Sequence, residues 1–262
     1  MGKLFIGTSG YKYDDWEGVY YPEGIKGNQF LSYYGKEFNT VEINFTYYTL
    51  PNPFIFQHML KKVDKDFIFS IKAHCSATHK RDLCKEDLQK YFQSVKCLSR
   101  EGRLGCILLQ FPYSFKYSEC NIKYLKELAK LYEGYNPVVE FRNISWMKKE
   151  VVSLLESLGL SFCNVDEPNI GGLLPPTAIT TSSIGYIRFH GRGVKNWWNP
   201  EHAYQRYDYS YSTDELLEWV PRIKRIAKST KKTFIYFNNH YRAKAVKSAQ
   251  ALIGLLKDTS QN

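Results

Sequence analysis

Charged and amide side chains recur at the ends of short apolar segments in this chain of 262 residues. In the segment 41–44, Glu42 and Asn44 alternate with Val41 and Ile43. Because successive side chains of a strand point to opposite faces, the polar members of such a segment share one face. The same alternation yields Glu42, Asn44, Ser70, Lys72, His74, Gln110, Glu140, Arg142, Asn164, Asp166, Arg188, His190, Tyr236 and Asn238.

These residue types suit acid–base chemistry on an anionic molecule. Carboxylates act as general acids or bases, histidine carries protons near neutral pH, and lysine and arginine hold anions through charge-assisted hydrogen bonds. We therefore expect Glu42, Glu140, Asp166 and His190 to be catalytic, and the ligand to be an anionic small molecule, phosphorylated or nucleotide-like. The residues expected to bind it are Thr8, Tyr11, Trp16, Asn44, Lys72, Gln110, Arg142, Trp146, Arg188, Gly191, Arg192 and Asn238.

Two loops are expected to complete such a site. Residues 191–198 combine glycines and basic side chains with Trp197 and Trp198, so that backbone amides could cradle a phosphate and the rings could stack on a base or sugar. Residues 8–22 are rich in tyrosine and tryptophan, which favours a loop that covers the mouth of a cavity. Alternatively, both loops only pack over the end of the fold.

The polar side chains also admit a purely structural interpretation. Lys72, Arg142 and Arg188 roughly balance the three carboxylates, so they could form an internal ion-pair network that satisfies only itself. Against this, the interior of a strand barrel is normally filled with Val, Ile and Leu, and charges gathered at the carboxyl ends of strands mark active sites.

The elements that must position these residues alternate between β-rich and amphipathic helical segments. The strands are expected at 4–7, 41–44, 68–72, 106–110, 138–140, 161–165, 186–190 and 234–238. Helical periodicity is clear in 88–98, 122–132, 151–158 and 245–256, and weaker in 30–38 and 54–63. A further helix, with Leu216, Leu217, Val220 and Ile223, opens with a Ser212-x-x-Glu215 capping box.

Eight strands, nearly all followed by a helix, are typical of a (β/α)8 barrel of about 250 residues. We predict an α/β fold, a single TIM-type barrel over residues 1–262, with an open doubly wound sheet as the alternative. Glycines and prolines in 168–176 predict an irregular sixth helix region.

Composition narrows the class of protein. The net charge is +10, hydrophobic residues make up 44% and aromatic residues 16%, which excludes a disordered chain. Charges interrupt every apolar window long enough to span a membrane, and the start of the chain lacks an apolar signal segment, so we expect a cytoplasmic protein with no membrane partner. The six cysteines form no C-x-x-C pair, which predicts free thiols.

An ordered set of motifs extends over residues 4 to about 252. The set includes Ile6-Gly-Thr-Ser-Gly10, Phe38-Asn-Thr-Val-Glu42-Ile-Asn44, Leu109-Gln-Phe-Pro112, Val139-Glu-Phe-Arg142, Ile187-Arg-Phe-His-Gly191 and Phe237-Asn-Asn239. It closely resembles the YecE-like family, catalogued as domain of unknown function 72. The resemblance implies a TIM-type barrel and implies no particular activity. Asn143 and Tyr113 stand where family members commonly carry His and Pro.

Two further functions are alternatives to an enzyme acting on an anion. Metal-assisted phosphodiester hydrolysis would use Glu42, Glu140, Asp166, His74 and His190 as ligands. Because histidine pairs at ligand spacing are missing and nearby cations would repel a metal ion, we expect no metal or cofactor. Non-catalytic nucleic-acid binding would use the positive charge, although many basic residues lie on or just beyond the predicted helix that starts at the capping box. The sequence does not predict the oligomeric state.

Overall fold

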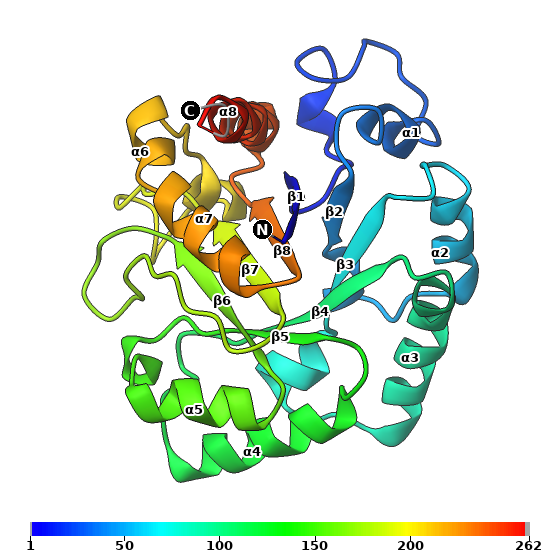
Figure 1. Ribbon diagram of the computed structural model, residues 1–262. Coiled ribbons are helices and arrows are strands. Elements are labelled where there is room, and N and C mark those ends of the chain that lie inside the picture. Colours follow the sequence, from blue (N-terminus) through cyan, green and yellow to red (C-terminus); the bar gives the residue numbers. More distant parts are fainter. Residues whose placement is uncertain (1, 260–262) are drawn as a thin grey trace.

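Within residues 2–259, which the computed structural model describes, eight parallel strands form a ring that helices surround (Figure 1). The strands are β1 (Lys3–Thr8), β2 (Thr40–Ile43), β3 (Ile68–Lys72), β4 (Leu104–Gln110), β5 (Pro137–Glu140), β6 (Ser161–Asp166), β7 (Ile184–Phe189) and β8 (Lys232–Phe237). They are hydrogen-bonded in the order β1-β8-β7-β6-β5-β4-β3-β2. All the predicted strands are therefore present.

The ring closes where β1 meets β2. Ser9 and Glu42 form a parallel bridge at this seam. Nearby, the hydroxyl of Tyr34 accepts a hydrogen bond from the Thr8 amide at 2.8 Å and donates one to the Thr40 carbonyl at 3.2 Å. A tyrosine hydroxyl thus links two strands whose backbones pair directly only at the bridge. The closure confirms the predicted (β/α)8 TIM-type barrel.

Amphipathic helices cover the outside of the barrel, as their periodicity predicts. In α3, Tyr91, Val95 and Leu98 recur at helical spacing and are buried. The helices are α1 (Phe30–Tyr34), α2 (Pro53–Leu60), α3 (Lys85–Arg100), α4 (Glu119–Leu131), α5 (Lys149–Ser157), α6 (Thr213–Leu217), α7 (Val220–Ser229) and α8 (Lys244–Asp258). Short helical turns in the loops are η1 (Asp14–Trp16), η2 (Phe45–Tyr47), η3 (Ser76–Lys80), η4 (Ile144–Trp146), η5 (Ala203–Tyr207) and η6 (Tyr241–Ala243).

The helix expected to start at Ser212 is in fact two helices, α6 and α7. Its capping box is confirmed, because Ser212 Oγ accepts from the Glu215 amide and Glu215 Oε2 accepts from the Ser212 amide. The break follows from Pro221, which lies in the first turn of α7. Proline has no N–H to donate to the preceding turn, so it starts a helix better than it continues one.

Residues 167–183 connect β6 to β7 without a helix in the described chain, which confirms the irregular sixth region. The loop packs its backbone on the outer face of β6. Asn164 Nδ2 donates to the carbonyl of Ile179 at 2.9 Å, and Asn164 Oδ1 accepts from the amide of Ile179 at 2.8 Å. The outer face of β6 therefore meets polar backbone groups where other strands meet apolar helix faces.

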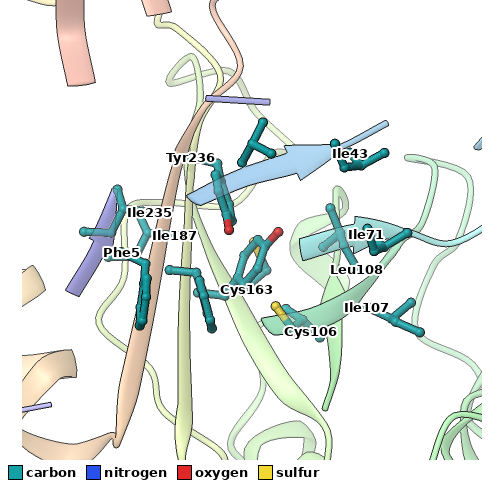
Figure 2. Close-up of a cluster of buried hydrophobic side chains, with 14 of the residues drawn as sticks. Phe5, Ile43, Ile71, Cys106, Ile107, Leu108, Cys163, Ile187, Ile235 and Tyr236 are labelled. Carbon is teal, nitrogen blue, oxygen red and sulfur yellow. The ribbon is translucent and has the colours of Figure 1, made fainter. Parts of the chain in front are cut away.

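Aromatic side chains fill much of the barrel interior. Phe5 stacks on Phe234 with ring centroids 5.0 Å apart, and Tyr186 lies 5.4 Å from Tyr236. The Tyr236 hydroxyl reaches Ser70 Oγ at 2.9 Å. Figure 2 shows Tyr236 among the buried side chains between the strands, with the sulfur atoms of two cysteines nearby. These rings pack beneath the polar side chains of the barrel mouth.

Two further predictions concern membrane association and the state of the cysteines. None of the helices within residues 2–259 combines the length and apolar character needed to cross a membrane. All six cysteines are free thiols, as their spacing predicts, and Cys106 and Cys163 are buried in the barrel wall. Each of these two buried thiols behaves as a small apolar group.

Candidate active site

A cavity of about 680 Å³ lies at the carboxyl ends of the strands. A second cavity of about 410 Å³ adjoins it and shares Tyr48, Lys72, Gln110, Arg142 and Tyr207 in its lining. Together they form the mouth of the barrel, the position at which TIM-type barrels place their active sites. Of the residues predicted to bind a ligand, those that line the larger cavity are Tyr11, Asn44, Lys72, Gln110, Arg142, Arg188 and Asn238.

Arg188 is the centre of a buried ion network under this cavity. Its Nη2 lies 2.7 Å from Glu42 Oε1 and its Nη1 lies 2.7 Å from Glu140 Oε2. The other oxygen of Glu42 accepts a hydrogen bond from the Tyr186 hydroxyl at 2.7 Å. Arg188 is 1% exposed and both carboxylates are completely buried. A guanidinium held between two acids is fixed in both position and charge.

Arg142 extends the network towards solvent. Its Nε pairs with Glu140 and its Nη1 lies 3.3 Å from Glu167 Oε2. Burial acts to raise the pKa of Glu140, but Arg142 and Arg188 oppose it strongly enough to hold that pKa well below its usual value. Glu140 is therefore ionised, and both of its oxygens are engaged by arginines.

His190 lies in the same network and is neutral at physiological pH. Its Nε2 is 3.2 Å from Glu140 Oε1 and 3.1 Å from Arg142 Nη2, and Asn238 Nδ2 is 3.2 Å from its Nδ1. Burial, reinforced by the charge of Arg142, lowers the pKa of His190 to about 3. The structure thus provides no positive charge at this imidazole.

Two of the carboxylates expected to be catalytic, Glu42 and Glu140, hold other side chains of the site in place. Glu42 and Glu140 do not line either mouth cavity, while the arginines that they hold do. What they do in this geometry is fix the two guanidinium groups. The internal ion-pair network expected as an alternative is therefore present, but its arginine face is open to a cavity.

Lys72 completes the basic lining. Its Nζ donates to Gln110 Oε1 at 2.8 Å and lies 4.4 Å from the centre of the Tyr47 ring. Burial, together with the charge of Arg188, lowers the pKa of Lys72 to about 7. Three buried polar atoms of lining residues, Arg188 Nε, Asn44 Oδ1 and His240 Nδ1, have no hydrogen-bond partner among the described residues. Arg188 Nε is an unused donor and Asn44 Oδ1 an unused acceptor, and the atoms themselves are buried.

Asp166 and Arg192 lie outside this site, which corrects the orientation expected for β6. Arg192 binds Asp166 through two nitrogens, with the shortest contact at 2.7 Å, and Tyr211 and Trp219 donate to the same carboxylate at 2.6 Å each. The Gly191 amide is also occupied, because it donates to the Tyr211 hydroxyl at 2.8 Å. The polar residues of β6 thus face outwards, Asn164 towards the loop 167–183 and Asp166 towards Trp219 at the start of α7.

Thr8, Trp16 and Trp146, also predicted to bind a ligand, lie outside the mouth lining as well. Trp16 Nε1 donates to the carbonyl of His240 and Trp146 Nε1 donates to the carbonyl of Phe115, both at 2.6 Å. Both indole rings are completely or almost completely buried. These side chains support the loops around the mouth through packing.

Sequence reasoning missed two residues of the mouth lining and one acid that lies behind it. Glu167 follows the inward parity of Cys163 along β6, and that parity is the signal that could have found it. Burial raises the pKa of Glu167 to about 7, against the opposing charge of Arg142. Lys12 and Arg206 add positive charge to the lining, and no periodicity indicates such loop residues.

A metal centre was the alternative that the carboxylates and histidines suggested. In residues 2–259, no three side chains of His, Cys, Asp or Glu gather into a group that could hold a metal ion. The histidine of the mouth network contacts a carboxylate, an amide and a guanidinium, and the last of these competes with a cation for the same space.

The fold and the mouth define a TIM-type barrel with a basic cavity at the carboxyl ends of its strands. The chain belongs to the family described as "Protein of unknown function DUF72", which matches residues 5–262. A curated relative, "UPF0759 protein YunF" of Bacillus subtilis, is 26% identical over 97% of this chain and 94% of its own.

Solved structures agree with the barrel. The crystal structure of a DUF72 family protein from Thermotoga maritima has a TM-score of 0.89 and 40% identity, over 97% of this chain and 99% of that one. A DUF72 family protein from Enterococcus faecalis has a TM-score of 0.86 and 21% identity, over 97% of this chain and 95% of that one. The first likeness supports the family and the second supports the fold.

Proposed function

We propose that this protein is an enzyme that acts on a phosphorylated or otherwise anionic small molecule bound at the mouth of the barrel. The observation that carries the proposal is the charge of the lining. Lys12, Lys72, Arg142, Arg188 and Arg206 line the two cavities, and no Asp or Glu of the described chain lines either one. Charged side chains of one sign in a low-dielectric cleft concentrate ligands of the other sign.

The arginines are held ready for an anion before it arrives. Glu42 and Glu140 fix the guanidinium of Arg188, so little side-chain entropy is lost when a ligand binds. The free Nε of Arg188 and the ammonium form of Lys72 provide charge-assisted donors to a phosphate or carboxylate. Fixed donors in a water-poor site are also the arrangement that stabilises developing negative charge during a reaction.

The second cavity favours a ligand that carries a flat ring as well as an anion. Tyr48, Tyr113 and Trp198 line it and are 77%, 37% and 44% exposed. Aromatic surfaces of this size that remain open to solvent are suited to stacking on a base or sugar. A nucleotide-like molecule would place its ring here and its phosphate on the arginines.

The experiment is a binding comparison between two matched arginine variants. Thermal shift and calorimetric titration would be run with sulfate, phosphosugars and nucleotides on the wild-type protein, Arg142→Gln and Arg192→Gln. Both variants remove an arginine that contacts a buried carboxylate, but only Arg142 lines the mouth. We expect anion affinity to fall at least tenfold in Arg142→Gln and to stay unchanged in Arg192→Gln. Equal behaviour of the two variants, or no anion that binds the wild type, would overturn the proposal.

A further inference from the structure

Lys72 is placed differently from the other cations of the mouth. It ends β3 and is one of the residues that line both cavities. No carboxylate of the described chain lies within ion-pair distance of Nζ. Lys72 is partly buried, and a lysine in such a position normally pairs with an acid, but Glu42 and Glu140 are engaged by arginines.

The surroundings of this amine favour its neutral form. The charged and titratable groups that face it are Glu42 on β2, Tyr47 on η2, His79 on η3, Glu140 and Arg142 at the end of β5, and Arg188 on β7. Burial and the positive charge of Arg188 lower its pKa to about 7. A large fraction of the lysine is thus unprotonated at neutral pH, with a free electron pair on nitrogen. Desolvation beside another cation is one of the ways in which proteins activate a nucleophilic lysine.

We propose that Lys72 Nζ is a nucleophile that forms a Schiff base with the aldehyde or ketone group of an anionic substrate. The inference rests on the proposed function, because Arg142 and Arg188 must hold the anion while the carbonyl group meets the amine. Gln110 Oε1 accepts one N–H of Lys72 and so orients the nitrogen within the mouth. Lys72 is reached from both cavities, which leaves room for substrate on either side of the new bond.

The step balances without any other reagent. The nitrogen electron pair attacks the carbonyl carbon, a C–N bond forms, and the carbonyl oxygen takes up a proton to give a carbinolamine. The C–O bond then breaks, and the oxygen leaves as water with the two protons that the amine nitrogen has lost. The imine that remains draws electrons from the adjacent bonds of the substrate. This is the requirement of aldol-type cleavage and formation of carbon–carbon bonds.

The experiment traps the imine chemically. The full-length protein would be incubated with glycolaldehyde phosphate and sodium borohydride, which adds hydride to the C=N carbon and makes the bond permanent. Intact-mass analysis and peptide mapping would locate the label. We expect one label per chain, at Lys72, which depends on both reagents and increases as the pH rises through 7. Labelling should fall at least tenfold when glycolaldehyde replaces its phosphate ester, and sulfate should compete.

Variants distinguish the nucleophilic role of the Lys72 amine from the role of its positive charge. Lys72→Arg keeps a cation and is expected to bind sulfate but to take up no label at this position. Lys148→Met removes an exposed lysine outside the mouth and is expected to label like the wild type. Exposed Lys12 in the wild type serves as the internal reference for ordinary amine reactivity.

The outcomes distinguish the two proposals. Sulfate binding without preferential labelling of Lys72 over Lys12 would overturn the Schiff base and leave the anion site standing. Preferential labelling of Lys72 that is indifferent to phosphate and sulfate would support the nucleophile and overturn the anion site. Neither binding nor preferential labelling would overturn both.

Discussion

Two buried carboxylate–arginine networks lie on opposite faces of the barrel wall. The inner network joins Glu42 and Glu140 to Arg188 under the mouth cavity. The outer network joins Asp166 to Arg192 between β6 and α6 and α7. From the sequence the two sets are indistinguishable, because both combine acids and arginines at the carboxyl ends of strands.

The two networks differ in whether their polar atoms all have hydrogen-bond partners. The carboxylate of Asp166 receives donors from Arg192, Tyr211 and Trp219, and Arg192 is in turn engaged by Glu218 at 2.9 Å. The outer network is closed. In the inner network, Arg188 Nε has no partner among the described residues and its side chain lines a cavity. An unused donor on a residue that lines a cavity, more than buried charge as such, distinguishes a binding site from a structural ion cluster.

The largest effect is expected from Arg188→Met. The variant leaves Glu42 without its guanidinium partner and Glu140 with one arginine in place of two, in a region where both acids are completely buried. Removal of one partner from a buried ion pair costs about 3–5 kcal/mol of unfolding free energy. Urea unfolding would measure it. Adding Glu42→Gln should recover part of the loss, and a single-variant loss below about 1 kcal/mol would contradict the network.

A slightly smaller loss of stability is expected from Asp166→Asn, without any effect on binding. The amide can accept at one oxygen only, so one or more of the donors from Arg192, Tyr211 and Trp219 loses its partner. We expect a loss of about 3 kcal/mol, since hydrogen bonds to buried charges are strong. Sulfate affinity, measured by calorimetry on the folded variant, should equal that of the wild type. Weaker binding would place Asp166 in the site after all.

Most of the fold follows from sequence periodicity. Period-two segments predicted every strand, and Tyr91, Val95 and Leu98 predicted the buried face of α3. The split between α6 and α7 depends on Pro221, which has no N–H to donate. The apolar pattern continues on both sides of this proline and therefore predicted one helix. The seam held by Tyr34 depends on a contact between distant segments, which no local pattern specifies.

The site was only partly predictable. On β7, alternation correctly placed Arg188 and His190 inside the barrel. On β6 the same rule failed, because it assumes an apolar helix outside the strand, whereas the loop 167–183 offers polar backbone groups to Asn164. The rule also says nothing about which charges cancel. Only the geometry shows that Glu42 is engaged by Arg188 and that a cation is left facing the cavity.

Only the inner network is expected to make anion binding depend on pH near neutrality. Lys72 has a pKa lowered to about 7, so it loses its positive charge as pH rises through that value. Glu167, with a pKa raised to about 7, gains negative charge behind Arg142 over the same range. Both changes weaken anion binding, and we expect sulfate affinity to fall about tenfold from about pH 6 to about pH 8.

Calorimetry with sulfate checks this, because the charge of sulfate is constant near neutral pH. Lys72→Met should remove most of the pH dependence and leave the small part due to Glu167. Asp166→Asn should keep the full dependence, because the outer network does not face the ligand. A wild-type affinity that is independent of pH would mean that Lys72 does not contact the anion.

The smallest effect is expected at the edge of the outer network, from Glu218→Gln. Glu218 lies 2.9 Å from Arg192, but its side chain is 52% exposed, so solvent screens the pair. Exposed ion pairs contribute less than about 1 kcal/mol, and Arg192 keeps its buried contact with Asp166 in the variant. Urea unfolding should show a change within that limit, and sulfate affinity should not change. A loss as large as that of Asp166→Asn would mean that the outer network depends on its exposed Glu218. Complete pairing of the polar atoms would then not explain the difference between the outer network and the binding site.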